Sequence, residues 1–269
     1  MRIDMADFQK KHLELYHLPG YFGSSVFWKM EKLCEDAEAF YLPEHDFYYV
    51  IRDKHLLMYY SPDGQCHIPV DELNSLNCIS MDAGMFDTVK DRLSGFEISY
   101  NEKLHYDKNY VPPILSGDKN DVVEFDFSNE EHYARVAHII NGCYDGNGNF
   151  SSERVKRIKS EYESFSVFDP SLWFFVRDKE IKKLIGIALS TYQKSIKQTV
   201  LDWIFILPEF HGAGAGRFMI QEIIRRSLGR SDSIIVGGLV AFYKKCGFYT
   251  YRRDVWAAKP GYSFNGPFA

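Results

Sequence analysis

The chain has 269 residues, 45% of them hydrophobic, which is enough for one large core or two ordinary ones and excludes general disorder. Its 32 basic and 37 acidic residues give a formal charge of -5, which argues against nucleic acid or an anionic membrane as partner. No apolar stretch approaches the ~20 residues of a membrane span, and the first residues lack the apolar core of a secretory signal.

The cysteines and histidines carry no metal or disulfide pattern. Five widely spaced cysteines include no CxxC pair, and the nine histidines form no HExxH and no Cys/His cluster. We therefore expect a cytoplasmic protein with no metal, no nucleic-acid partner and no membrane partner, whose ligand is a small molecule or peptide. Whether it forms a homodimer is left open.

The segment from Asn109 to Asp121 is typical of an interdomain linker, because it combines a Pro-Pro pair, a Ser-Gly and a charged run. We place the boundary there, with an N-terminal α/β domain at residues 1–115 and a C-terminal domain at residues 116–269. Residues 47–60 and 91–100 resemble later segments, at 173–187 and around Gly247. These matches fit either a tandem duplication or unrelated hairpins of similar composition.

The second half alternates strand and helix patterns. Period-two runs predict strands and period-3.6 runs predict helices, and Ser128 with Glu131 resembles a capping box at the first helix. In chain order the expected elements are a strand at 122–127, helices near 128–143 and 155–165, strands at 172–178, 183–193 and 199–207, a helix after Gly216 that stops at Gly229, a strand at 233–236, a helix at 240–246 and a strand at 248–257. This order predicts a mixed α/β layer fold with an α+β mixed sheet.

The most informative run is a glycine-rich turn between a strand and a long amphipathic helix. Pro208 ends the strand, and Gly212, Gly214 and Gly216 follow at once. Glycines let a backbone approach a ligand closely, and the start of a helix offers unpaired N–H groups and partial positive charge to phosphate. The run therefore predicts a pyrophosphate cradle.

Two common phosphate loops do not match these residues. The Rossmann G-x-G-x-x-G would need glycine where Arg217 or Met219 stands, and the Gly-Lys-Ser/Thr of the Walker loop is absent. What remains, His211, Gly214 and Gly216, resembles the signature of the GNAT superfamily of N-acetyltransferases. The later run AFYKKCGF, which contains Tyr243, resembles the family's late Tyr-x-x-x-Gly-Phe motif, and the resemblance covers roughly residues 122–258.

The resemblance implies a GNAT-like acyltransferase fold, with a first half that is a degenerate GNAT-like or partner domain, and acetyl-CoA as cofactor. The cofactor would be held by the strand end, where exposed backbone groups of Ile204 and Ile206 bind the pantetheine arm, and by the turn that follows. The expected cofactor-binding residues are Ile204, Phe205, Ile206, His211, Gly212, Ala213, Gly214, Ala215, Gly216 and Arg217. His211 departs from the family's arginine or glutamine and is only partly charged near neutral pH, so Arg217 could supply the missing charge.

Two residues are candidates for proton transfer. Tyr243 stands where the family often has the acid that protonates the departing CoA thiolate; the alternative is a core tyrosine. Asp202 shares strand parity with Ile204 and Ile206, so it could face the cleft as general base; the alternative is an edge carboxylate in a salt bridge. Asp145, in a Gly/Asn-rich loop, could attract a cationic amine; such loops are more often solvated connections.

The resemblance thus implies transfer of an acetyl group from acetyl-CoA to a primary amine of a small molecule or peptide, by direct attack in a ternary complex. The alternative is a non-catalytic acyl-CoA-binding sensor or regulatory module. Cofactor binding without transfer to any amine would distinguish the second from the first.

Overall fold

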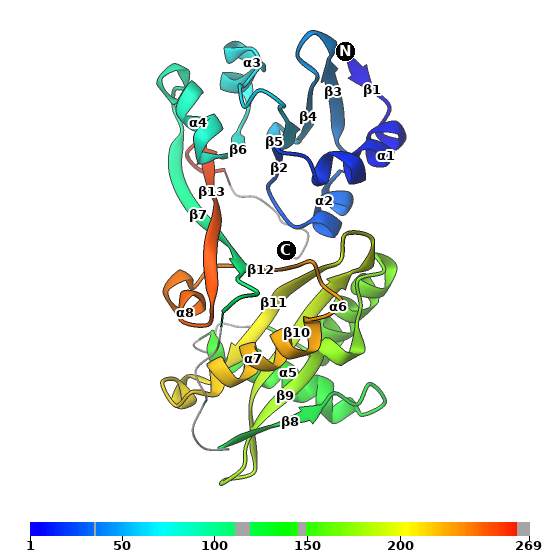
Figure 1. Ribbon diagram of the computed structural model, residues 1–269, viewed down its shortest axis with the longest axis vertical. Coiled ribbons are helices and arrows are strands. Elements are labelled where there is room, and N and C mark those ends of the chain that lie inside the picture. Colours follow the sequence, from blue (N-terminus) through cyan, green and yellow to red (C-terminus); the bar gives the residue numbers. More distant parts are fainter. Residues whose placement is uncertain (35, 111–118, 145–148, 263–269) are drawn as a thin grey trace. The chain divides into compact units, whose positions relative to one another are not determined.

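The computed structural model describes residues 1–34, 36–110, 119–144 and 149–262 (Figure 1). The chain divides into two compact units, of which unit 1 comprises Met1–Lys103 and Tyr251–Ala269 and unit 2 comprises Leu104–Thr250. The boundary expected between residues 115 and 116 lies outside the described residues. No helix in the described part of the chain is long and apolar enough to cross a membrane.

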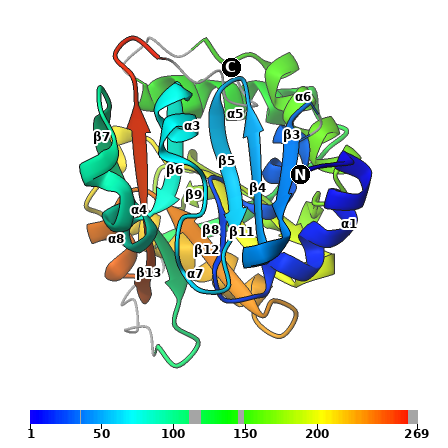
Figure 2. The same ribbon diagram turned by 90° about the horizontal axis from the view of Figure 1, so that it is seen from above.

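Unit 1 is a mixed sheet with helices. Its elements are β1 (Arg2–Ile3), α1 (Met5–Tyr16), β2 (Tyr21–Gly23), α2 (Phe27–Leu33), β3 (Glu38–Leu42), β4 (Phe47–Arg52), β5 (His55–Tyr60), α3 (Val70–Ser75), β6 (Cys78–Asp82), α4 (Ala83–Val89), the first part of β7 (Glu97–Tyr106) and the last part of β13 (Phe248–Ala258). The strand order is β1-β3-β4-β5-β6-β13, and Figure 2 shows β3, β4 and β5 side by side. Only β5 and β6 run parallel within this order.

Unit 2 has a similar architecture. Its elements are β8 (Asn120–Glu124), α5 (Glu130–Cys143), α6 (Ser152–Ser164), β9 (Trp173–Asp178), β10 (Lys183–Gln193), β11 (Gln198–Ile206), α7 (Ala215–Ser227), β12 (Ser233–Gly237) and α8 (Val240–Lys244), together with the remaining parts of β7 and β13. The strand order β12-β11-β10-β9-β8 is antiparallel except for the parallel pair β11 and β12. The predicted mixed α/β fold is confirmed.

The order of elements repeats along the chain. The series β3-β4-β5-α3-β6-α4-β7 of the first half has the same order of elements as β9-β10-β11-α7-β12-α8-β13 of the second, and the strands β3-β4-β5-β6 pair in the same directions as β9-β10-β11-β12. A short difference lies upstream, where β2 stands between α1 and α2. The repeated order supports the duplication that the sequence left open, because similar composition alone would not repeat a parallel crossover at the same place.

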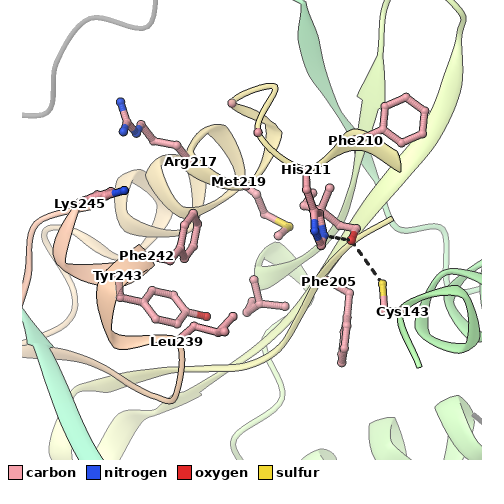
Figure 3. A pocket seen from close by; sticks show the side chains of 15 residues that line it. Cys143, Phe205, Phe210, His211, Arg217, Met219, Leu239, Phe242, Tyr243 and Lys245 are labelled. Atoms are coloured by element: carbon pink, nitrogen blue, oxygen red, sulfur yellow. Dashed lines mark hydrogen bonds between the residues drawn. The ribbon is translucent and has the colours of Figure 1, made fainter. Parts of the chain in front are cut away.

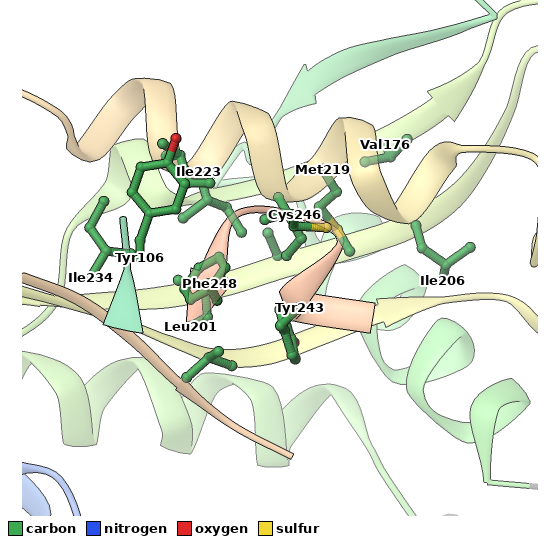
Figure 4. Packing of buried hydrophobic residues seen from close by; sticks show 14 of the residues in the cluster. Tyr106, Val176, Leu201, Ile206, Met219, Ile223, Ile234, Tyr243, Cys246 and Phe248 are labelled. Atoms are coloured by element: carbon green, nitrogen blue, oxygen red, sulfur yellow. The ribbon is translucent and has the colours of Figure 1, made fainter. Parts of the chain in front are cut away.

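Helix α7 packs its apolar face on the sheet of unit 2. The 3.6-residue period of the sequence predicts an apolar face of Met219, Ile220, Ile223, Ile224 and Leu228; the first four are buried, whereas Leu228 follows the end of the helix and is 46% exposed. Met219 and Ile223 pack in one core with Leu201 and Ile234 (Figure 4). The helix ends at Ser227, and Gly229 follows with a φ of +91°, as expected of a glycine that stops a helix.

The start of α5 differs from the prediction. Asn129, and not Ser128, is the N-cap, and its side chain accepts a hydrogen bond from the Glu131 N–H. Ser128 is engaged elsewhere, since its N–H and hydroxyl both donate to the carboxylate of Asp126. A local Asx turn therefore competes successfully for the serine.

Candidate functional site

One edge of β11 is open just before the glycine-rich turn. The strand pairs with β12 only through residues 198–200, whereas it pairs with β10 as far as Ile206. The Leu207 N–H donates to the Ile185 carbonyl, so the backbone of Leu207 faces β10. By alternation the backbone groups of Ile206 and Ile204 point away from β10, toward the edge that β12 has left. These are the two residues expected to bind the pantetheine arm.

A pocket of about 760 Å³ lies at this open edge (Figure 3). Its lining combines the end of β11, the glycine-rich turn, the start of α7 and α8. The lining residues are Cys143, Ile204, Phe205, Ile206, Phe210, His211, Gly212, Gly214, Gly216, Arg217, Met219, Leu239, Phe242, Tyr243 and Lys245. Eight of the ten residues expected to bind the cofactor are among them. Ala213 and Ala215 are not, and Ala215 is packed in the core.

The glycines of the turn have different roles. Gly212 and Gly214 have φ angles of +81° and +91°, and a Cβ on either would meet no atom within 4 Å. A Cβ on Gly216 would instead stand 3.2 Å from Cζ of Phe242, so this glycine permits close packing of α7 against α8. Helix α7 begins directly after Gly214 and has no side-chain cap, which leaves its first N–H groups for an anion.

His211 is turned onto the open edge of β11. Its Nε2 lies 2.8 Å from the carbonyl oxygen of Ile206, and because a carbonyl only accepts, Nε2 carries the proton. The same oxygen accepts a hydrogen bond from Sγ of Cys143 at 3.3 Å, and Figure 3 shows both contacts. Burial raises the pKa of the Cys143 thiol to about 11, so it keeps the proton that it donates.

Cys143 is a site residue that the sequence analysis did not single out. The helical period of the sequence puts Cys143 on one face with Tyr133, Val136 and Ile140, but no local pattern indicates that the end of α5 meets the end of β11. Lys245 and Phe242, which flank Tyr243 in the late motif, were also missed, as was Leu239 just before that motif.

Tyr243 lines the pocket from α8 and is only 4% exposed. Burial raises its pKa well above the ordinary value for a tyrosine, so the phenol stays protonated across the physiological range. Among the described residues no hydrogen-bond partner is found for its hydroxyl. It packs against Phe242 and Phe248, which fix the ring.

Asp202 lies in a different setting from the one that strand parity predicted. The register of β11 against β10 shifts between the pairs Leu189–Trp203 and Thr191–Val200, which inserts one extra residue in β11 beside Asp202. Alternation therefore fails across this bulge. The carboxylate accepts a hydrogen bond of 2.6 Å from the buried hydroxyl of Tyr162 on α6, and Asp202 is not among the residues that line the pocket.

Two further expectations concern residues around the site. Asp145, expected to attract the acceptor amine, lies outside the described residues. In the ranges that the structure describes, no group of three or more His, Cys, Asp or Glu side chains is placed to hold a metal ion.

Comparisons with known proteins point to one family. The profile of the acetyltransferase (GNAT) family matches residues 133–248. A curated relative, GCN5-related N-acetyltransferase 2 (chloroplastic) of Arabidopsis thaliana, is 28% identical over 102 residues, which are 36% of this chain and 39% of that protein. The match thus spans about two fifths of that relative's length.

Solved structures share the fold over nearly the whole chain. A GNAT-family acetyltransferase from Colwellia psychrerythraea has a TM-score of 0.62 at 12% identity and covers 96% of this chain and 98% of its own. A tandem GNAT protein from the clavulanic acid biosynthesis pathway has a TM-score of 0.56 at 10% identity and covers 98% and 99%. At such identities these structures establish the fold alone. Residues 133–248 thus match the profile of the acetyltransferase (GNAT) family, and the solved structures agree with that match in fold.

Proposed function

We propose that unit 2 transfers an acetyl group from acetyl-CoA to a primary amine of a small molecule or peptide, by direct attack of the amine in a ternary complex. The observation that carries this proposal is the meeting, in one pocket, of the open edge of β11, the glycine-rich turn and the Tyr243 hydroxyl.

The pocket suits the cofactor in size and charge. Its volume of about 760 Å³ lies within the range of ligand sites, roughly 300–1,000 Å³. The space beside Gly212 and Gly214, which any Cβ would enter, is where the first N–H groups of α7 would bind the pyrophosphate, with Arg217 and Lys245 as nearby cations. The backbone of Ile204 and Ile206 would hold the pantetheine arm. When bound, acetyl-CoA supplies the activated acetyl group.

Tyr243 supports the chemistry as a proton donor. Because burial raises its pKa, the hydroxyl holds its proton at the wall of the pocket and can donate a hydrogen bond to a developing anion there. Transfer of that proton to the departing thiolate requires that the same apolar surroundings also make the thiolate a stronger base. The Ile204 and Ile206 N–H groups can stabilise negative charge on the acetyl oxygen.

The proton of the attacking amine needs an acceptor. An alkyl amine with a pKa near ~10.4 is almost entirely protonated at neutral pH. Asp202 would act through a water, because its carboxylate is held by Tyr162 outside the pocket lining. If an Asp202→Asn variant keeps the wild-type acid limb of the pH–rate profile, this assignment is wrong and water alone takes the proton.

The test is a calorimetric titration of acetyl-CoA into the wild type and a Gly214→Glu variant, followed by a panel of primary amines. We expect micromolar binding, about -8 kcal/mol, that is lost in the variant because it places bulk and negative charge in the cradle. Turnover with an amine would support the enzyme. Firm binding without transfer to any amine would favour an acyl-CoA sensor, and absence of binding to the wild type would overturn both.

A further inference from the structure

Strand β5 of unit 1 occupies the same place in the element order as β11 of unit 2, yet its corresponding edge is not open. It pairs in parallel with β6 only at His55 and Leu56, just as β11 pairs only briefly with β12. Residues 58–60 of β5 pair with β4 along one edge and with β2 along the other. Because β4 holds the edge away from β6, β2 lies on the edge along which β6 pairs with the start of β5. The chain itself fills the gap.

The backbone pairing of β2 with β5 extends past the strand at both ends. The Ser61 N–H donates to the Gly20 carbonyl at 3.0 Å, and the Ser24 N–H donates to the Leu57 carbonyl at 2.9 Å. Gly20 has a φ of +89°, and a Cβ there would overlap the carbonyl oxygen of Ser61. The approach of this segment to β5 therefore requires glycine at position 20.

Side chains hold β2 in place. Phe22 is 1% exposed and stacks on Tyr59, with ring centroids 5.1 Å apart. The guanidinium carbon of Arg252 lies 4.7 Å from the centre of the Phe22 ring. The same guanidinium donates a 2.9 Å hydrogen bond to the Gly23 carbonyl. Asp254 pairs with the same guanidinium at 2.6 Å, so the arginine is fixed.

We propose that β2 is a built-in occupant of the edge of β5 at which the pantetheine arm of a cofactor would pair, so that each chain takes up one acetyl-CoA, in unit 2 alone. The stoichiometry rests on the function proposed above, whereas the occupied edge does not. In the described part of unit 2 no strand pairs with that edge of β11 beyond Val200, and the Ile206 carbonyl there accepts hydrogen bonds from the side chains of His211 and Cys143. In unit 1 the three corresponding backbone positions are already paired with β2.

The crossover of unit 1 is also unsuited to a pyrophosphate. Helix α3 has six residues, follows Pro69 and carries Asp71 and Glu72 in its first turn, where the carboxylates would repel phosphate. By contrast, α7 has 13 residues and no acid in its first turn. Tyr243 lies four residues before Gly247 in unit 2, and Asp91 holds the corresponding position before Gly95 in unit 1. Unit 1 therefore lacks a tyrosine at this position.

Hydrogen exchange on the full chain tests the occupied edge, with calorimetry for the stoichiometry. Without ligand, we expect the amides of Tyr59 and Ser61 to exchange slowly, and saturating acetyl-CoA should not change their rates. The amides of Ile204 and Ile206 should exchange faster without ligand, and their exchange should slow by about tenfold or more when acetyl-CoA binds. The calorimetric stoichiometry should be one. Two acetyl-CoA per chain, or protection of β5 that appears only with acetyl-CoA, would overturn the proposal.

Two variants of unit 1 give a matched comparison. Gly20→Ala forces β2 away from Ser61, whereas Gly64→Ala, at a φ of +70° and with no atom within 4 Å of the added Cβ, imposes similar backbone strain without that clash. We expect exchange at Tyr59 and Ser61 to rise about tenfold or more in the first variant only. Equal exchange in both variants contradicts the proposal. If acetyl-CoA binds nowhere, the function proposed for unit 2 fails, and the exchange of β5 without ligand still decides whether its edge is filled.

Discussion

The role of Gly214 can be separated from its backbone conformation by a comparison with Gly229. The two glycines flank α7 at its opposite ends, both have a φ of +91°, and a Cβ on either would meet no atom within 4 Å. An alanine should cost about 1 kcal/mol of unfolding free energy at each position, since the left-handed region disfavours a Cβ. Urea unfolding of both variants should therefore give the same loss of stability.

Only Gly214→Ala should weaken binding of acetyl-CoA. Its methyl group enters the space in which phosphate would contact the first N–H groups of α7, whereas Gly229 lies at the other end of the helix, beyond Ser227. Loss of one charge-assisted hydrogen bond, about 1.5–3 kcal/mol, corresponds to a roughly 10- to 150-fold higher Kd. Calorimetric titration of both variants measures it. If Gly214→Ala and Gly229→Ala had the same Kd for acetyl-CoA, the proposed phosphate-binding role of Gly214 would be wrong, and its only role would be to begin α7.

Three further outcomes are expected. Tyr243→Phe should lower kcat by about 10²–10⁴ with an unchanged Kd for acetyl-CoA, and full turnover would remove the tyrosine as acid. Leu239 has a φ of +40° and is 73% exposed, and asparagine tolerates this backbone conformation better than leucine. Leu239→Asn should therefore raise Tm by about 2 °C, and no change in Tm would show that the strain at Leu239 is small. Burial lowers the pKa of His12 and of His55 to about 4, so below about 6.5 the unfolded chain binds protons that the folded chain does not. Stability should therefore fall by about 2 kcal/mol for each histidine between pH 7 and pH 5 in urea unfolding, and a flat profile would contradict their burial as neutral rings.

The glycine-rich turn and α7 could be predicted from the sequence because their signals are local. Gly212 and Gly214 stand where the backbone takes positive φ, and the apolar repeat from Met219 to Ile224 identifies the buried face of the helix. Eight cofactor-binding candidates line the pocket for the same reason, since they are consecutive along one strand and turn.

What could not be predicted depends on partners distant in the sequence. The bulge that moves Asp202 out of alternation is a property of the register between β10 and β11, and neither strand reveals it alone. The contact of Cys143 with Ile206 joins two elements 63 residues apart. β2 is three residues long, and its pairing with Tyr59 leaves no periodic pattern in the sequence.

The last strand gives the chain an unusual order of completion during synthesis. Residues Asp254 to Ala258 of β13 pair with β6 in unit 1, and Arg252 holds the Gly23 carbonyl, so unit 1 depends on residues that leave the ribosome after all of unit 2. At a synthesis rate of about 5–20 residues per second, the roughly 150 residues of unit 2 take about 7–30 s to be made, and β6 has no β13 to pair with during that time. Until the residues after Thr250 are made, the edge of β6 that pairs with β13 stays unpaired, and such an edge can pair with another chain. The half of the protein that is made first is thus the half that is finished last.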